Sequence, residues 1–121
     1  MNIKQWVKYY QDGKFENKML AAGWFDWFCT RKELSKKTDE LAKFLIKIKD
    51  CPNLKDANVQ LQNSHECDRI HLTNGKCKII IMRFNGPIIF RWGVYITING
   101  ELYKDKTWLT FNQAAKILMN N

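Results

Sequence analysis

One stretch of this sequence is rich in basic and aromatic side chains and has no acidic ones. Its 32 residues, 69–100, contain no Asp or Glu. The basic residues are Arg69, Lys76, Lys78, Arg83 and Arg91, and the aromatic ones include Phe84, Phe90, Trp92 and Tyr95. Lys and Arg bind phosphate or carboxylate groups, and aromatic rings stack on nucleobases. The stretch therefore predicts a surface for a polyanion or an acidic partner, with a merely solvated sheet face as the alternative.

The alternation of residue types indicates which of these side chains share a face of a strand. Arg91 and Tyr95 fall opposite the apolar series of their predicted strand, so they are expected to be exposed together. Lys76 and Lys78 share one side of the preceding strand, whereas Arg83 falls on the side of two isoleucines. The predicted contact set nevertheless takes all five basic residues and one aromatic residue: Arg69, Lys76, Lys78, Arg83, Arg91 and Tyr95.

His65, Cys67, His71 and Cys77 have residue types that bind zinc. Structural zinc sites usually take four such ligands from pairs at close spacing, and here the ligands are split over two predicted strands. Cys67 and Cys77 lie on the two arms of one predicted hairpin, where they could be near neighbours. Whether all four converge stays open. Reduced thiols and ordinary histidines are the favoured interpretation, so we predict no metal and no cofactor.

The sequence gives little support for catalysis. A cysteine nucleophile needs a positioned base, and Cys67 is too close to His65 along one strand to indicate such a pair. His65, Glu66 and His71 could serve a small ribonuclease, with the histidines as acid and base. No serine-centred elbow or glycine-rich phosphate loop is present. We therefore predict that the protein is not an enzyme.

Size and charge agree with a small basic binding protein. The 121 residues are enough for one domain, residues 1–121, with its own core. A net charge of +8 and a pI of about 9.4 favour nucleic acid or an acidic protein surface as partner. With no signal-peptide pattern and no apolar run long enough to cross a membrane, we expect a location in the bacterial cytoplasm.

Hydrophobic periodicity predicts helices followed by strands. Helices are expected at 3–12, ending at Gly13, at 15–28 with an interruption near Gly23, and from Thr30 to the stop at Cys51–Pro52. Leu41, Leu45 and Ile48 share the core face of the third helix with Leu34. A last helix begins near Thr110, which forms a capping pattern with Gln113.

Between these helices the sequence predicts strands. The predicted strands are 59–62, 67–72, 76–84, 88–98 and 101–103. The turns between them include Asn74–Gly75 and Asn99–Gly100, and Asn-Gly is a strong hairpin signal. The predicted fold class is α+β, with N-terminal helices packed on a small antiparallel meander and a closing C-terminal helix.

Four large aromatic residues fall within five positions: Trp24, Phe25, Trp27 and Phe28. One helical turn cannot bury all of them, so one or two are expected to be exposed. Tryptophan is enriched at the energetic centres of protein interfaces. Trp24 and Trp27 are therefore predicted as secondary anchors for a partner.

Residues 23–29, Gly-Trp-Phe-Asp-Trp-Phe-Cys, followed by Leu34 and Lys37–Thr38, resemble a G-W-[YF]-D-W-F-C…L…K-T pattern. This pattern is similar to that of small accessory proteins of phages, plasmids and integrative elements in low-GC bacteria, which include anti-CRISPR proteins. The resemblance implies an inhibitor of a bacterial defence system and brings no catalytic residues with it.

The expected function is thus non-enzymatic binding to a host defence nuclease, or to the guide RNA or DNA that the nuclease holds. A charge of +8 argues against mimicry of nucleic acid. The alternative is a small basic nucleic-acid-binding protein that uses the same residues. The sequence predicts neither the identity of the target nor the oligomeric state.

Overall fold

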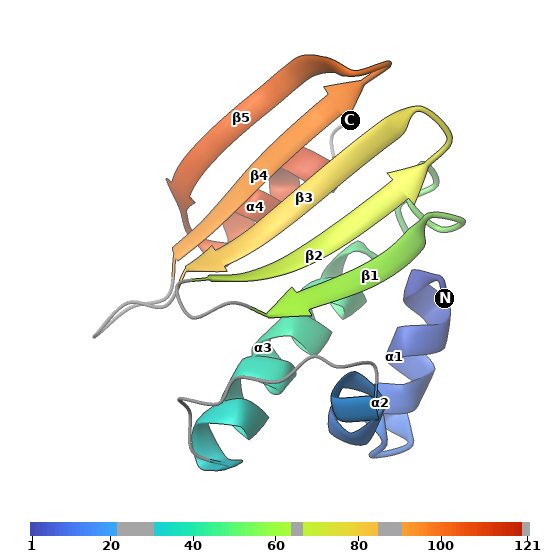
Figure 1. Ribbon diagram of the computed structural model, residues 1–121, viewed down its shortest axis with the longest axis vertical. Coiled ribbons are helices and arrows are strands. Elements are labelled where there is room, and N and C mark those ends of the chain that lie inside the picture. Colours follow the sequence, from blue (N-terminus) through green and yellow to red (C-terminus); the bar gives the residue numbers. More distant parts are fainter. Residues whose placement is uncertain (22–30, 64–66, 85–90, 120–121) are drawn as a thin grey trace.

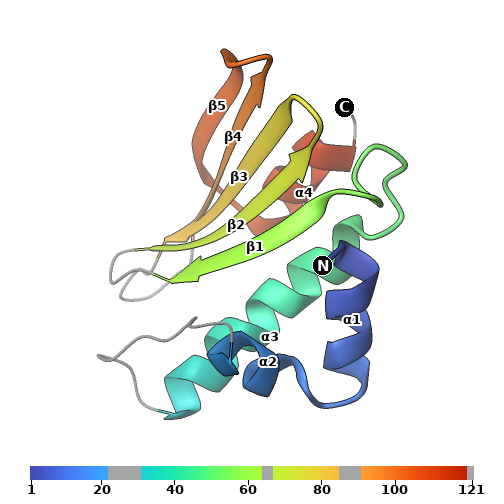
Figure 2. The same cartoon turned by 45° about the vertical axis from the view of Figure 1, so that its right-hand side comes forward.

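The computed structural model describes residues 1–21, 31–63, 67–84 and 91–119, and in them a five-stranded antiparallel sheet carries four helices on one face (Figures 1 and 2). In chain order the elements are α1 (Ile3–Gln11), α2 (Phe15–Ala21), α3 (Arg31–Ile48), β1 (Asn58–Asn63), β2 (Cys67–Asn74), β3 (Cys77–Phe84), β4 (Arg91–Ile98), β5 (Glu101–Leu109) and α4 (Phe111–Met119). The strands lie side by side in that order, so the sheet is a meander. This arrangement confirms the predicted α+β fold.

Capping boxes begin the first and last helices. The backbone N–H of Gln5 donates to Asn2 Oδ1 at 3.0 Å, and the Asn2 N–H donates back to Gln5 Oε1 at 2.8 Å. Thr110 and Gln113 form the same reciprocal pair at the start of α4, as predicted. Each box satisfies two backbone donors that the first turn leaves unpaired. The predicted cap at Thr30 lies outside the described residues.

Tight turns set the register of the meander. Gly75, Asn99 and Gly100 have φ values of +60°, +55° and +82°, which are the left-handed values that two-residue hairpin turns require. These turns confirm the predicted hairpins. The last strand, however, extends to Leu109 rather than ending at Tyr103. Most of β5 is exposed at the sheet edge, so its sequence lacks the alternation that identifies a half-buried strand.

The core lies between the sheet and the helices. Leu41, Leu45 and Ile48 of α3 are fully buried, as predicted from their spacing. Trp92 of β4 stacks on Phe44 of α3 with ring centroids 4.6 Å apart, and Phe111 of α4 meets both rings edge-on. This aromatic cluster joins α3 and α4 to β4 of the sheet.

A polar contact ties α1 to α3. The Tyr10 hydroxyl donates to Asp39 Oδ1, and Lys43 Nζ lies 2.8 Å from Asp39 Oδ2. The bond from Lys43, and then that from Tyr10, lowers the pKa of Asp39 below its usual 3.8. Because the folded chain holds this carboxylate ionised, the contact is fully present above pH 3.8 and is lost as the pH falls through the lowered pKa.

Tyr10→Phe is therefore expected to lower the free energy of unfolding by about 1 kcal/mol at pH 7. The loss should shrink as Asp39 becomes protonated. Urea unfolding at pH 7 and at pH 3 measures both quantities. Tyr9→Phe is the matched control, because the ring of Tyr9 packs on Trp6 with centroids 6.1 Å apart and keeps that contact without its hydroxyl. Equal losses in the two variants would contradict the role given to Asp39.

Candidate nucleic-acid interface

The face of the sheet that points away from the helices, here the outer face, holds much of the predicted contact set. Residues of β2, β3 and β4 alternate between buried positions that face the helices and outer-face positions, which are half-buried or exposed except at Cys67 and Gly93. The outer-face residues of β2 to β4 are Cys67, Arg69, His71, Thr73, Lys78, Ile80, Met82, Phe84, Arg91, Gly93, Tyr95 and Thr97. Arg69, Lys78, Arg91 and Tyr95 are thus brought onto one surface.

The register places the basic side chains around an apolar centre. Arg69 lies opposite Met82, and Arg91 lies opposite Phe84. Tyr95 lies opposite Ile80 in the middle of the face. Neighbouring strands are about 4.8 Å apart, so these side chains are within reach of one ligand that crosses several strands.

Gly93 leaves space on β4 that side chains of β3 occupy. A Cβ atom at Gly93 would lie 3.1 Å from Met82 Cε and 3.2 Å from the Phe84 ring, closer than ordinary van der Waals contact. The Met82 and Phe84 side chains therefore cover the position where β4 has no side chain. The result is an apolar floor from β3 across β4.

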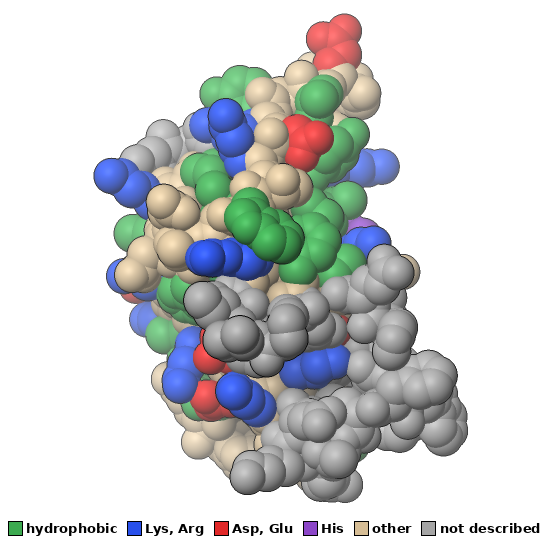
Figure 3. Space-filling view, turned by 90° about the vertical axis from the view of Figure 1, so that its left-hand side faces the viewer, with side chains coloured by type: hydrophobic (Ala, Val, Ile, Leu, Met, Phe, Trp, Pro, Cys, Tyr) green, Lys and Arg blue, Asp and Glu red, His purple; other side chains and the backbone are tan. Residues whose placement is uncertain are grey.

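The charge on this face is one-sided. On the described outer-face positions of β1 to β4 there is no Asp or Glu, because Asp68 faces the helices and is fully buried. The nearest acidic side chain on β5 is Asp105, which pairs with Tyr95. Figure 3 looks onto the β5 side of the molecule, where hydrophobic side chains gather with Lys and Arg beside them and with Asp and Glu toward the upper end.

His71 belongs to the same face. Its Nε2 lies 2.9 Å from Gln62 Oε1 of β1. Partial burial, and next the positive charge of Arg69, lower the pKa of His71 below its usual 6.5. The folded chain therefore keeps the imidazole neutral to lower pH than the unfolded chain does.

The lowered pKa of His71 makes the free energy of unfolding depend on pH in a predictable direction. The unfolded chain binds the proton more tightly, so the free energy of unfolding should fall as the pH drops below 6.5 and level off below the lowered pKa. His71→Gln should lose this part of the pH dependence. Urea unfolding of both proteins between pH 7.5 and pH 4.5 measures the difference, and parallel curves would contradict it.

The structure removes Arg83 from the predicted contact set. It is fully buried on the helix side of β3, directly opposite Asp68, and its Nη1 lies 3.5 Å from Asp68 Oδ2. Burial lowers the pKa of Arg83, and the nearby carboxylates of Asp68 and Glu40 oppose that shift. Arg83 is an interior ion-pair residue and is not available on the outer face.

The remaining predicted residues divide into two groups. Lys76 is exposed in the turn between β2 and β3, two residues from Lys78. Trp24 and Trp27 lie outside the described residues. Sequence reasoning missed Met82, Phe84 and Gly93 as a unit, although the lone glycine inside a strand pattern is a known signal for a close approach of neighbours.

The structure also shows that Cys67 and Cys77, which the sequence allowed to be near neighbours, lie apart. Cys67 pairs with Phe84 and Cys77 pairs with Asn74, so the thiols lie at opposite ends of the β2–β3 hairpin. Cys67 shares the outer face with His71, whereas Cys77 lines a cavity on the helix side. Cys67, His71 and Cys77 do not converge, and the described residues contain no group of three metal-binding side chains. His65 lies outside the described residues.

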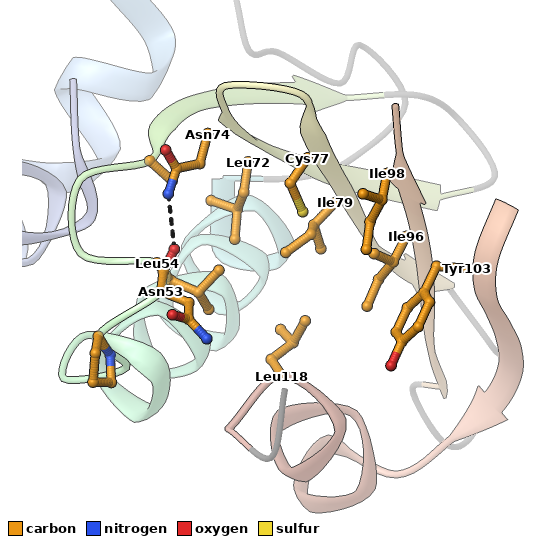
Figure 4. Close-up of a pocket in the computed structure, with 12 residues that line it drawn as sticks. Asn53, Leu54, Leu72, Asn74, Cys77, Ile79, Ile96, Ile98, Tyr103 and Leu118 are labelled. Carbon is orange, nitrogen blue, oxygen red and sulfur yellow. Dashed lines mark hydrogen bonds between the residues drawn. The ribbon is translucent and has the colours of Figure 1, made fainter. Parts of the chain in front are cut away.

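That cavity lies between the sheet, α4 and the loop after α3 (Figure 4). Its volume is about 460 Å³, and much of its lining is aliphatic, including Leu72, Ile96 and Leu118. At its rim Asn74 Nδ2 donates to the Asn53 carbonyl oxygen at 3.0 Å. In the described part of the chain no Lys or Arg lines this cavity, so its chemistry does not suit a polyanion.

Comparisons with protein-family models, with curated proteins and with solved structures found no match to this chain. Within the described residues, none of the helices combines the length and apolar character needed to cross a membrane.

Proposed function

We propose that the protein acts by non-enzymatic binding and that its outer face binds nucleic acid. The observation that carries this proposal is the placement of Arg69, Lys78 and Arg91 around an apolar and aromatic centre, without an acidic side chain on the described β1–β4 part of the face. Basic side chains neutralise phosphates, and a flat apolar or aromatic surface accepts bases. An excess of eight positive charges favours the encounter.

The biological setting that we propose is inhibition of a bacterial defence system. The motif at residues 23–29 supports it through its similarity to accessory proteins of mobile elements. In that setting the bound nucleic acid is the guide RNA, or the DNA, held by a CRISPR effector nuclease. Binding there would block the complex without any chemical step.

The direct test is fluorescence anisotropy of labelled 20-nucleotide RNA and DNA, titrated with the purified protein at 50, 100 and 200 mM salt. We expect binding whose logarithmic affinity falls linearly with the logarithm of salt, because bound phosphates release counterions. Absence of binding at 50 mM salt would refute the proposal.

An acidic surface of the effector nuclease is the second candidate, and the net charge of +8 favours it equally. Affinity purification of the tagged protein from a low-GC bacterial host, with and without nuclease treatment, separates the two. A defence protein recovered in both samples indicates direct protein contact. Recovery that is lost after nuclease treatment indicates contact through nucleic acid.

A further inference from the structure

Trp108 has an unusual backbone and an unusual exposure. Its φ is +64°, a left-handed value that bulky residues rarely adopt. Its side chain is 72% exposed, the highest value among the large hydrophobic side chains that the structure describes as exposed. The strain, typically 1–3 kcal/mol, is therefore not offset by burial of the indole.

The backbone at this position has a structural purpose that does not need tryptophan. Thr107 and Trp108 together lie opposite Gly93, which makes a β-bulge between the pairs Val94–Lys106 and Trp92–Leu109. The bulge lets Leu109 pair with the buried Trp92 just before Thr110 caps α4. Glycine or asparagine would fit the same φ with less strain. The choice of an exposed indole is thus left unexplained by folding.

The register places the backbone of Trp108 opposite Gly93, at the β5 edge of the outer face. Gly93, opposite the bulge, is the residue over which Met82 and Phe84 lie. A Cβ atom at Gly93 would also be 3.3 Å from the Lys106 carbonyl oxygen, so β5 approaches this point closely. The backbone of Trp108 therefore lies at the β5 end of a row of paired positions that begins at Arg69 and continues through Met82 and Gly93.

We propose that the ligand of the outer face is single-stranded nucleic acid and that Trp108 stacks on one of its bases. This inference rests on the proposed function and names its ligand class. In a duplex the bases are paired and stacked inside, whereas an unpaired base can lie flat on an indole. The basic charge of the face complements the phosphates on either side of that base.

The experiment compares Trp108→Gly with the wild-type protein, because glycine adopts the left-handed backbone without strain and removes the indole side chain. We expect Trp108→Gly to melt at the wild-type temperature or above it. Its affinity for a 12-nucleotide oligo-dT should fall roughly ten- to hundredfold, as for loss of one stacked base. Trp108→Phe should recover part of this loss. Tyr103→Ala is the matched control, since Tyr103 is an exposed aromatic residue near the other end of β5.

The outcomes separate this inference from the proposed function. Full oligo-dT affinity in a folded Trp108→Gly protein overturns the stacking role and leaves the outer-face function standing. If the wild-type protein binds a 12-base-pair duplex as tightly as it binds oligo-dT, the single-strand preference is overturned. Absence of binding of the wild-type protein to either probe overturns the proposed function itself. An equal loss in Tyr103→Ala also overturns a specific role for Trp108.

Discussion

Arg83→Met is expected to lower the free energy of unfolding by about 3–5 kcal/mol. Arg83 and Asp68 are both fully buried and face each other across the β2–β3 ladder. Removing the guanidinium would take away the cation that lies 3.5 Å from the buried Asp68 carboxylate. A buried charge without a counter-charge is among the most costly defects in a folded protein.

The double variant Asp68→Leu/Arg83→Met tests the cause. It removes both charges and fills the space with apolar side chains, so it should recover most of the stability lost in the single variant. Arg69→Met is the matched control, because Arg69 lies on the same hairpin but on the outer face. Its effect should stay within about 0.5 kcal/mol. Urea unfolding followed by circular dichroism measures all four proteins.

Two outcomes would contradict this account. A loss below 1 kcal/mol in Arg83→Met would show that groups other than Arg83 stabilise the Asp68 carboxylate in the interior. A double variant as unstable as the single one would show that the pair is needed for packing geometry and not for charge balance. Because the protein has other stabilising contacts at Trp92 and Phe44, the single variant should still fold at low temperature.

The case of Arg83 shows what strand alternation can and cannot predict. Alternation places Arg83 on the side of Ile79 and Ile81, and the structure confirms that side. Arginine side chains are nevertheless mostly exposed in folded proteins, so the charge of Arg83 favours an exposed position. Burial is possible because Asp68 lies opposite, and that pairing depends on the register between two strands. A charged residue on a buried side is therefore a reason to look for its partner on the neighbouring strand.

The two cysteines show that more could have been derived from the turn. Asn74 and Gly75 identify the hairpin turn in the sequence, and the observed pair Asn74–Cys77 closes it. Once the turn is placed, every other pair of the two strands follows, including Cys67 with Phe84. The separation of Cys67 from Cys77 was thus predictable. The bulge opposite Gly93 was not, because no local pattern indicates a left-handed tryptophan.

Charge reversal of the outer face is expected to have the largest effect on binding. Arg69→Glu/Lys78→Glu/Arg91→Glu should weaken binding to a single-stranded oligonucleotide by more than a hundredfold at 50 mM salt. Each lost contact between a cation and a phosphate is worth roughly a factor of ten at a solvent-exposed site. Three new carboxylates would in addition repel the phosphates.

The salt dependence gives a second readout that does not depend on absolute affinity. Replacing the same three residues with Gln removes three phosphate contacts, so the slope of logarithmic affinity against logarithmic salt should become shallower by about 2. Tyr95→Ala should weaken binding and leave that slope unchanged, since its ring carries no charge. A Gln variant with the wild-type slope would exclude Arg69, Lys78 and Arg91 as phosphate contacts.

The lower net charge of the triple variant could by itself weaken binding. A second triple variant with the same net charge separates this general effect from the loss of local contacts. Lys4 in α1, Lys14 just before α2 and Lys47 in α3 are exposed on the helical side of the molecule. Their replacement by Glu lowers the net charge from +8 to +2, as does the outer-face reversal, because each replacement changes the charge by two. Long-range attraction is screened beyond about 8 Å at 0.15 M salt. The helix variant should therefore keep most of its affinity at that salt concentration, while the outer-face variant should lose nearly all of it. Equal losses would place the contact elsewhere on the protein.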